Sequence, residues 1–256
     1  MPSGQDVEQR GGDRIEPRAE SAASGRGTPV SDLLVEALGP AIATASVLDC
    51  GGGTGRYAVP LAAAGAMVTV VDVSADALAT LRRRAAEAGV ADRVRGVQGD
   101  VEALVDSAAG GPFDLVLAHG ILDVVDRPAA TFAGIVAAVR PGGLLSVMIA
   151  NPVATVLARA LAGDLAGAER EIEVLDDGSG AIATPDQVLR QCAEHGLEVE
   201  NQRGIGIFRD LVPGQALDAP GARDALARLE NACAQRAPFA QIANRVHVLA
   251  RRPARG

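Results

Sequence analysis

The segment that most constrains the fold of this chain is ASVLDCGGGTGRY at residues 45–57. A short apolar run ends in Asp49 and breaks into a turn with glycines at positions 51, 53 and 55, after which apolar residues recur with helical spacing. The order of strand, glycine turn and helix opens a doubly wound α/β unit. Because glycine has no Cβ, the turn can take positive φ angles and approach a ligand closely. We therefore predict a ligand site at this turn.

Two residues of this segment indicate the class of ligand. The dinucleotide fingerprint needs a third glycine three residues after the second, and Arg56 stands there instead. The carboxylate of Asp49 would repel a pyrophosphate and attract a ligand that carries an ammonium and a sulfonium group. S-adenosylmethionine (SAM) fits this charge pattern, and an NAD-dependent oxidoreductase is the disfavoured alternative.

Strand and helix patterns continue to alternate up to residue 150. Periodicity predicts strands at 67–72, 94–98, 113–119 and 144–149, with helices between residues 74 and 89 and at 127–139. This alternation predicts a parallel sheet with helices on both faces. Asp72 and His119 close two of the strands at the carboxyl edge, where open α/β sheets bind ligands. A carboxylate in the place of Asp72 is suited to accept both hydroxyls of a ribose.

Beyond residue 150 the pattern is less regular. We expect helices at 153–161, 185–195 and 222–233, strands at 197–208 and 246–250, and a loop or lid at the acidic and then glycine-rich segment 169–180. Residues 1–28 lack apolar periodicity and are expected to form a disordered tail. Residues 29–256 would then form one domain.

Charge and cysteine content narrow the functional classes. The chain has 256 residues and a net charge of −8, yet residues 203–256 hold nine arginines against four acidic residues. This basic quarter is either a solvated surface or a contact region for an anionic substrate. Three cysteines without CxxC spacing indicate neither a zinc site nor a disulfide framework, so no metal is expected. No secretory signal or membrane-spanning run is visible, and we expect a cytoplasmic protein that does not bind membranes.

The D-x-G-x-G-x-G order of residues 49–55 resembles motif I of the class I SAM-dependent methyltransferases. Five segments together resemble the bacterial tRNA 5-carboxymethoxyuridine methyltransferases, which esterify a carboxylate on a wobble uridine. They are LDCGGG (48–53), AHGILDVV (118–125), VRPGGLLS (139–146), GIGIFRD (204–210) and HVLARRP (247–253). The resemblance covers residues 45–253. It implies SAM as cofactor and an α/β fold with a Rossmann-like, seven-stranded, mostly parallel sheet of the class I methyltransferase type, whose last strand is antiparallel.

Carried over position by position, the resemblance implies a set of cofactor-binding residues. They are Asp49, Gly51, Gly52, Gly53, Gly55, Asp72, Asp100, Val101, Glu102 and His119. Gly51 and Gly52 would contact the cofactor through their backbone, and Asp72 would hold the ribose. The turn at 100–102 would flank the adenine, and His119 would lie at the reactive side of the cofactor.

Methyl transfer from SAM is an in-line displacement, so the enzyme must align a nucleophile with the sulfonium methyl group. A carboxylate nucleophile is ionised at neutral pH. It needs a clamp, for which Arg245, His247 and Arg209 are candidates. A hydroxyl or amine nucleophile needs a base, for which His119 or His247 is suited. The predicted catalytic residues are thus His119, Arg245 and His247, with packing inside a strand as an equal alternative role for His247.

The methyl acceptor stays open between tRNA and a small molecule. The tRNA methyltransferases carry a lysine-rich run after their fifth strand, whereas residues 169–177 are acidic here, which opposes phosphate binding. One tyrosine, four phenylalanines and no tryptophan provide few rings for base stacking. The alternatives are a tRNA carboxylate methyltransferase, a small-molecule O- or N-methyltransferase, and a catalytically silent protein that binds SAM as the partner of another subunit.

Overall fold

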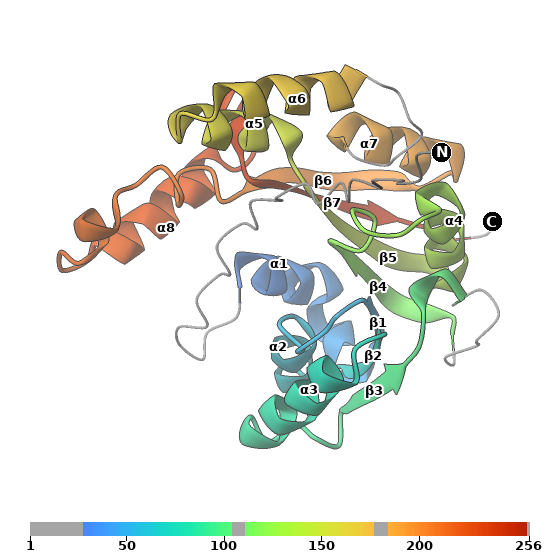
Figure 1. The fold of residues 1–256 in the computed structure, drawn as a ribbon. Helices are drawn as coiled ribbons and strands as arrows, with labels where there is room; N and C mark the ends of the chain where they lie inside the picture. The colour runs from blue at the N-terminus through green and yellow to red at the C-terminus, as the bar shows by residue number, and fades with distance from the viewer. Residues whose placement is uncertain (1–27, 104–110, 177–183, 255–256) are drawn as a thin grey trace, which may run out of the picture.

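A seven-stranded sheet organises the computed structural model, which describes residues 28–103, 111–176 and 184–254 (Figure 1). The strands are β1 Ser46–Cys50, β2 Met67–Asp72, β3 Val94–Gln98, β4 Phe113–His119, β5 Val139–Ala150, β6 Glu198–Ile205 and β7 Arg245–Arg251. Their order is β3-β2-β1-β4-β5-β7-β6, and β7 alone runs antiparallel to both neighbours among these described strands. The predicted sheet is confirmed. Except for Thr28, the expected tail at 1–28 lies outside the described residues.

Helices lie on both faces of this sheet, as expected for a mostly parallel one (Figure 1). The α-helices are α1 Pro29–Leu38, α2 Ala58–Ala63, α3 Ala75–Glu87, α4 Pro128–Ala138, α5 Pro152–Leu161, α6 Leu165–Asp176, α7 Pro185–Glu194 and α8 Ala222–Cys233. Short 3-10 turns are η1 Gly39–Thr44, η2 Val101–Ala103, η3 Gly214–Leu217 and η4 Phe239–Ile242. None of the helices in the described ranges has the length and apolar character needed to cross a membrane.

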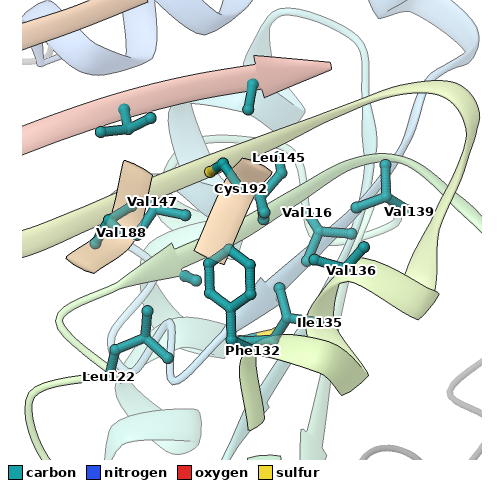
Figure 2. Close-up of a cluster of buried hydrophobic side chains, with 14 of the residues drawn as sticks. Val116, Leu122, Phe132, Ile135, Val136, Val139, Leu145, Val147, Val188 and Cys192 are labelled. Atoms are coloured by element: carbon teal, nitrogen blue, oxygen red, sulfur yellow. The ribbon is translucent and has the colours of Figure 1, made fainter. Parts of the chain in front are cut away.

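The apolar core is divided by the sheet into two clusters. On one face, Phe132 and Ile135 of α4 pack with Val188 and Cys192 of α7 against strand residues such as Val147 (Figure 2). On the other face, α1, α2 and α3 supply the second cluster, which packs on the same strands. Strands buried on both sides need apolar side chains at successive positions, which is why they read as continuous apolar runs in the sequence.

The loop expected at 169–180 is wrong for its described part, because α6 is helical as far as Asp176, while the alternative role as a lid stays a prediction. Alanine, leucine and glutamate favour a helix here. Asp164 accepts a hydrogen bond from the N–H of Gly167 at 2.9 Å at the start of α6. Arg159 on α5 pairs with Asp164 at 2.9 Å and with Glu171 at 3.0 Å. These contacts hold α5 and α6 side by side (Figure 1), and residues 177–180 of the expected loop lie outside the described residues.

The loop after β6 is held by one carboxylate. The strand expected at 197–208 ends at Ile205, and Gly206 takes a φ of 71°. Glu230 of α8 then accepts three backbone hydrogen bonds, from the N–H groups of Ile207 at 2.7 Å, Phe208 at 2.8 Å and Arg209 at 2.9 Å. Because the pairing of β6 with β7 sets Ile205 opposite Arg245, this loop lies at the carboxyl edge of the sheet.

We predict that Glu230→Gln lowers the free energy of unfolding by about 2 kcal/mol, because the amide has no charge and one acceptor oxygen fewer for three N–H donors. Urea unfolding followed by circular dichroism measures the change. Glu173→Gln on the exposed surface of α6 is the matched control and should change stability little. Equal stability of the two variants would show that Glu230 does not hold the loop.

Candidate functional site

The glycine turn joins β1 to α2 at the carboxyl edge of the sheet. Gly51, Gly53 and Gly55 have φ angles of 69°, 51° and 80°, which residues with a side chain rarely adopt. Asp72 at the end of β2 holds this turn, since its Oδ2 accepts a hydrogen bond from the Gly53 N–H at 2.9 Å. Its Oδ1 accepts another from the Ser74 N–H at 2.8 Å. The turn and Asp72, both predicted as ligand-binding features, are therefore in direct contact.

Asp49 lies beneath the turn with its side chain fully buried. A Cβ at position 52 would lie 2.3 Å from its Oδ2, so only glycine fits at Gly52. Within the part of the chain that the structure describes, neither carboxylate oxygen has a hydrogen-bond partner. Burial, and after it the charge of Asp72, raises the pKa of Asp49 to about 7. An unpaired buried carboxylate is costly, and a positive ligand group beside the turn would offset that cost.

The segment after β3 lies next to Asp72. The Gly99 N–H donates to the Asp72 carbonyl at 3.1 Å. The Oδ1 of Asp100 accepts from the Glu102 N–H at 2.8 Å, and the Oε1 of Glu102 accepts from the Arg127 N–H at 2.7 Å at the start of α4. The side chain of Val101 is buried in the core. The residues predicted to surround an adenine are thus brought beside the residue predicted to hold a ribose.

His119 ends β4 at the same edge. Its ring meets the edge of Tyr57 with 4.4 Å between ring centroids. Its Nε2 lies 2.7 Å from the hydroxyl of Ser146 on β5, and that hydroxyl lies 2.7 Å from the Nε2 of His247 on β7. His247 is fully buried, and its ring centroid lies 5.8 Å from that of His119, with the Ser146 hydroxyl hydrogen-bonded to both rings. The structure thus joins the two predicted histidines by a third residue.

Both imidazoles are neutral at physiological pH. Burial first, and then the charges of His247, Arg245 and Arg56, hold the pKa of His119 well below its usual 6.5. Burial, followed by the charge of Arg203, lowers the pKa of His247 to about 3. A neutral imidazole donates or accepts hydrogen bonds, but rings with such depressed pKa values are weak bases.

Three arginines from separate elements surround Tyr57. Arg56 follows the glycine turn, Arg209 lies on the loop held by Glu230, and Arg245 begins β7. The Arg56 guanidinium carbon lies 5.7 Å from the Tyr57 ring centroid. Burial lowers the pKa of Arg56, the charge of Tyr57 opposes this, and Arg209 and Arg245 lower it further. Arg56, Arg209 and Arg245, called the arginine cluster below, thus concentrate positive charge near Tyr57.

Sequence reasoning missed Ser146 and Arg56. Ser146 is the one polar residue in the apolar run 144–149, and this exception in the sequence could have identified it as a candidate. Arg56 was considered only as the residue that breaks the dinucleotide fingerprint, and its approach to Arg209 depends on the folded chain. In the described ranges, no group of three or more His, Cys, Asp or Glu residues is arranged to hold a metal ion.

Comparisons with known proteins agree with this geometry. A methyltransferase-domain family model matches residues 47–143. The tRNA 5-carboxymethoxyuridine methyltransferase of Escherichia coli K12 is 28% identical over 211 residues, which cover 81% of this chain and 80% of that protein. The ubiquinone biosynthesis O-methyltransferase of Thiobacillus denitrificans is 32% identical over 171 residues, which cover 64% of this chain and 69% of that enzyme.

Solved structures share the fold at lower identity. The glycopeptide N-methyltransferase MtfA in complex with S-adenosyl-L-homocysteine superposes with a TM-score of 0.55 at 20% identity, covering 93% of this chain and 94% of that one. The magnesium protoporphyrin IX methyltransferase of Synechocystis PCC 6803 gives a TM-score of 0.56 at 16% identity, covering 87% and 82%. The sheet order, the glycine turn and these relatives together show that the chain belongs to the class I SAM-dependent methyltransferases.

Proposed function

We propose that this methyltransferase esterifies a carboxylate on its acceptor. The arginine cluster carries this proposal, because the charges of all three arginines act on Tyr57, and those of Arg56 and Arg245 also act on His119, whose ring contacts Tyr57. An arginine binds a carboxylate through paired, charge-assisted hydrogen bonds. A clamp of this kind would hold the acceptor close to the cofactor.

The residues at the turn fit SAM. The buried carboxylate of Asp49, which has no hydrogen-bond partner in the described ranges, favours a positive ligand group at the turn. Each oxygen of Asp72 already accepts one N–H and retains a lone pair for a ribose hydroxyl. The backbone of Gly51–Gly55 and the segment 100–102 would complete the site. Bound SAM supplies an electrophilic methyl group.

The chemistry of the site favours a carboxylate over a hydroxyl or amine as nucleophile. A carboxylate is ionised at neutral pH and loses no proton in the reaction. A hydroxyl or amine requires a base with a pKa near the working pH, and burial and nearby arginines hold the pKa of His119 far below that. His119 is therefore proposed to contact the acceptor as a neutral hydrogen-bonding group, while the arginines align it for in-line attack.

The wobble 5-carboxymethoxyuridine of tRNA is the first candidate acceptor. It is named in the relative that aligns with four-fifths of this chain, and its carboxylate suits the arginine cluster. A small anionic molecule is the second candidate, favoured by the acidic side chains Glu169, Glu171 and Glu173 on α6, which would repel a nucleic-acid backbone. The O-methyltransferase relative also acts in the biosynthesis of a small molecule, ubiquinone.

We expect the protein to methylate bulk tRNA from an Escherichia coli strain that lacks its own tRNA 5-carboxymethoxyuridine methyltransferase. Radiolabel from SAM should enter the tRNA, and mild alkali should release it, because the product is an ester. Mass spectrometry of the nucleosides locates the methyl group. Label that enters only a tRNA-free small-molecule extract would assign the second candidate, and alkali-stable label would exclude carboxylate esterification.

Arg245→Ala is predicted to raise the KM for the acceptor at least tenfold, corresponding to the loss of ~1.5–3 kcal/mol from one charge-assisted hydrogen bond. The Kd for SAM should stay within twofold, because the proposal assigns Arg245 to the acceptor and not to the cofactor. Steady-state kinetics and calorimetry measure the two constants. Arg223→Ala on the exposed surface of α8 is the control, and an unchanged KM for Arg245→Ala would remove it from the clamp.

Asp72→Asn should weaken SAM binding by roughly 10- to 100-fold, because the amide keeps the shape but loses the charge and one acceptor oxygen. Isothermal titration calorimetry measures the Kd, and thermal unfolding checks that the variant is folded. Asp76→Asn, in the exposed first turn of α3, serves as control. Equal affinity of both variants would contradict the ribose assignment.

SAM binding should strengthen as pH rises toward 7. Because the pKa of Asp49 is raised to about 7, most of this carboxyl is protonated below that pH, and a positive ligand requires its ionised form. Binding then releases a proton, so the Kd should fall by up to about tenfold per pH unit between pH 5.5 and 7. Asp49→Asn should lose this dependence. A wild-type Kd that is constant over this range would contradict contact between Asp49 and a positive group.

A further inference from the structure

The hydroxyl of Ser146 lies between two imidazoles in the interior of the sheet. β5 is the middle strand of β4, β5 and β7, and Met148 on β5 pairs with both His119 and His247. Ser146 lies two residues earlier on the same face, fully buried, with its Oγ 2.7 Å from both Nε2 atoms. Among the described residues, Ser146 is the one side chain that hydrogen-bonds to both rings.

Counting protons constrains this arrangement. A hydroxyl has one proton to donate and two lone pairs that accept. When the hydroxyl donates this proton to one Nε2, the other ring donates its own Nε2–H to the hydroxyl oxygen. One neutral imidazole then carries its proton on Nδ1 and the other on Nε2. Ser146 thus couples the tautomer of His119 to that of His247.

The surrounding charges show that this set of three residues is not a proton relay. His119 faces Tyr57, Arg56 and Arg245, while His247 is buried next to Arg203. A proton passed from the acceptor through Ser146 would make His247 an imidazolium beside a guanidinium, away from water. The set is therefore suited to hold a neutral ring in place.

We propose that Ser146 is a positioning residue for methyl transfer, which fixes the ring orientation and tautomer of His119, with His247 as its buried anchor. This role rests on the proposed function in that His119 contacts the acceptor. His119 projects from the last residue of β4, where the following Gly120 takes a φ of 75° and the strand ends. Among the described residues, the Ser146 hydroxyl is the one hydrogen-bond partner of the His119 ring, because Nδ1 of that ring has none.

Ring-nitrogen NMR tests the coupling without any acceptor. In two-bond ¹⁵N–¹H correlation spectra of the full chain at pH 7, His119 and His247 should be neutral and of opposite tautomers. Ser146→Ala should shift the ring nitrogens of both, while His195 at the end of α7, outside this set, serves as reference. Identical tautomers in the wild type, or unchanged His119 signals in Ser146→Ala, would overturn the proposal.

Kinetics test the effect on the reaction. With SAM and the tRNA substrate described above, or the active small-molecule fraction, Ser146→Ala should lower kcat at least tenfold and leave the Kd for SAM within twofold. Ser146→Cys is a second variant, whose thiol is a weak hydrogen-bond donor. Its kcat should lie between those of the wild type and Ser146→Ala. Val147→Ala, which removes packing on the opposite face, controls for general destabilisation and should keep kcat within twofold.

The outcomes separate the two hypotheses. If Ser146→Ala turns over as fast as the wild type, the positioning role is wrong and the methyl-transfer proposal stands. If the wild type methylates neither acceptor fraction with an alkali-labile bond, the carboxylate proposal fails, and so does the part of this inference that concerns the reaction. The ring-nitrogen spectra still decide whether Ser146 fixes the tautomer of His119.

Discussion

The close contact between Asp49 and the glycine turn is the constraint on which the site depends. The carboxylate occupies the space that a side chain at Gly52 would need, and it is buried without a partner in the described structure. Its raised pKa means that ionisation of Asp49 destabilises the free protein as pH rises toward 7. A positive ligand group would offset the free-energy cost of ionising the buried Asp49. Part of the folding stability that this carboxylate costs would therefore be recovered when the ligand binds.

The site is divided by charge. Asp49 and Asp72 supply negative charge at the glycine turn, and the arginine cluster supplies positive charge near Tyr57, beside the neutral ring of His119. This division suits transfer from a cation to an anion, in which both charges disappear in the products. Preorganised charges of opposite sign can hold two such reactants together without reorganising during the step.

The sheet could be predicted from the sequence because its strands are buried on both faces and read as apolar runs. Local sequence patterns did not predict features that depend on contacts between residues far apart in the sequence. The helix α6 was missed because its acidic residues suggested a loop, while Arg159 from α5 supports them. Arg56 is joined by Arg209 only because a much later loop returns to the glycine turn, and that loop is fixed by Glu230 of α8. Such contacts are set by topology, which a single sequence does not display.

The direction of β7 explains how the end of the chain contributes to the site. In the parallel strands, the last residues, such as Asp72 and His119, reach the carboxyl edge. Because β7 is inserted antiparallel between β5 and β6, its first residue, Arg245, lies there instead, opposite Ala150. The same insertion brings His247 within reach of the Ser146 hydroxyl. A parallel strand in this place would reverse the order of these two residues along β5 and separate Arg245 from Arg56 and Tyr57.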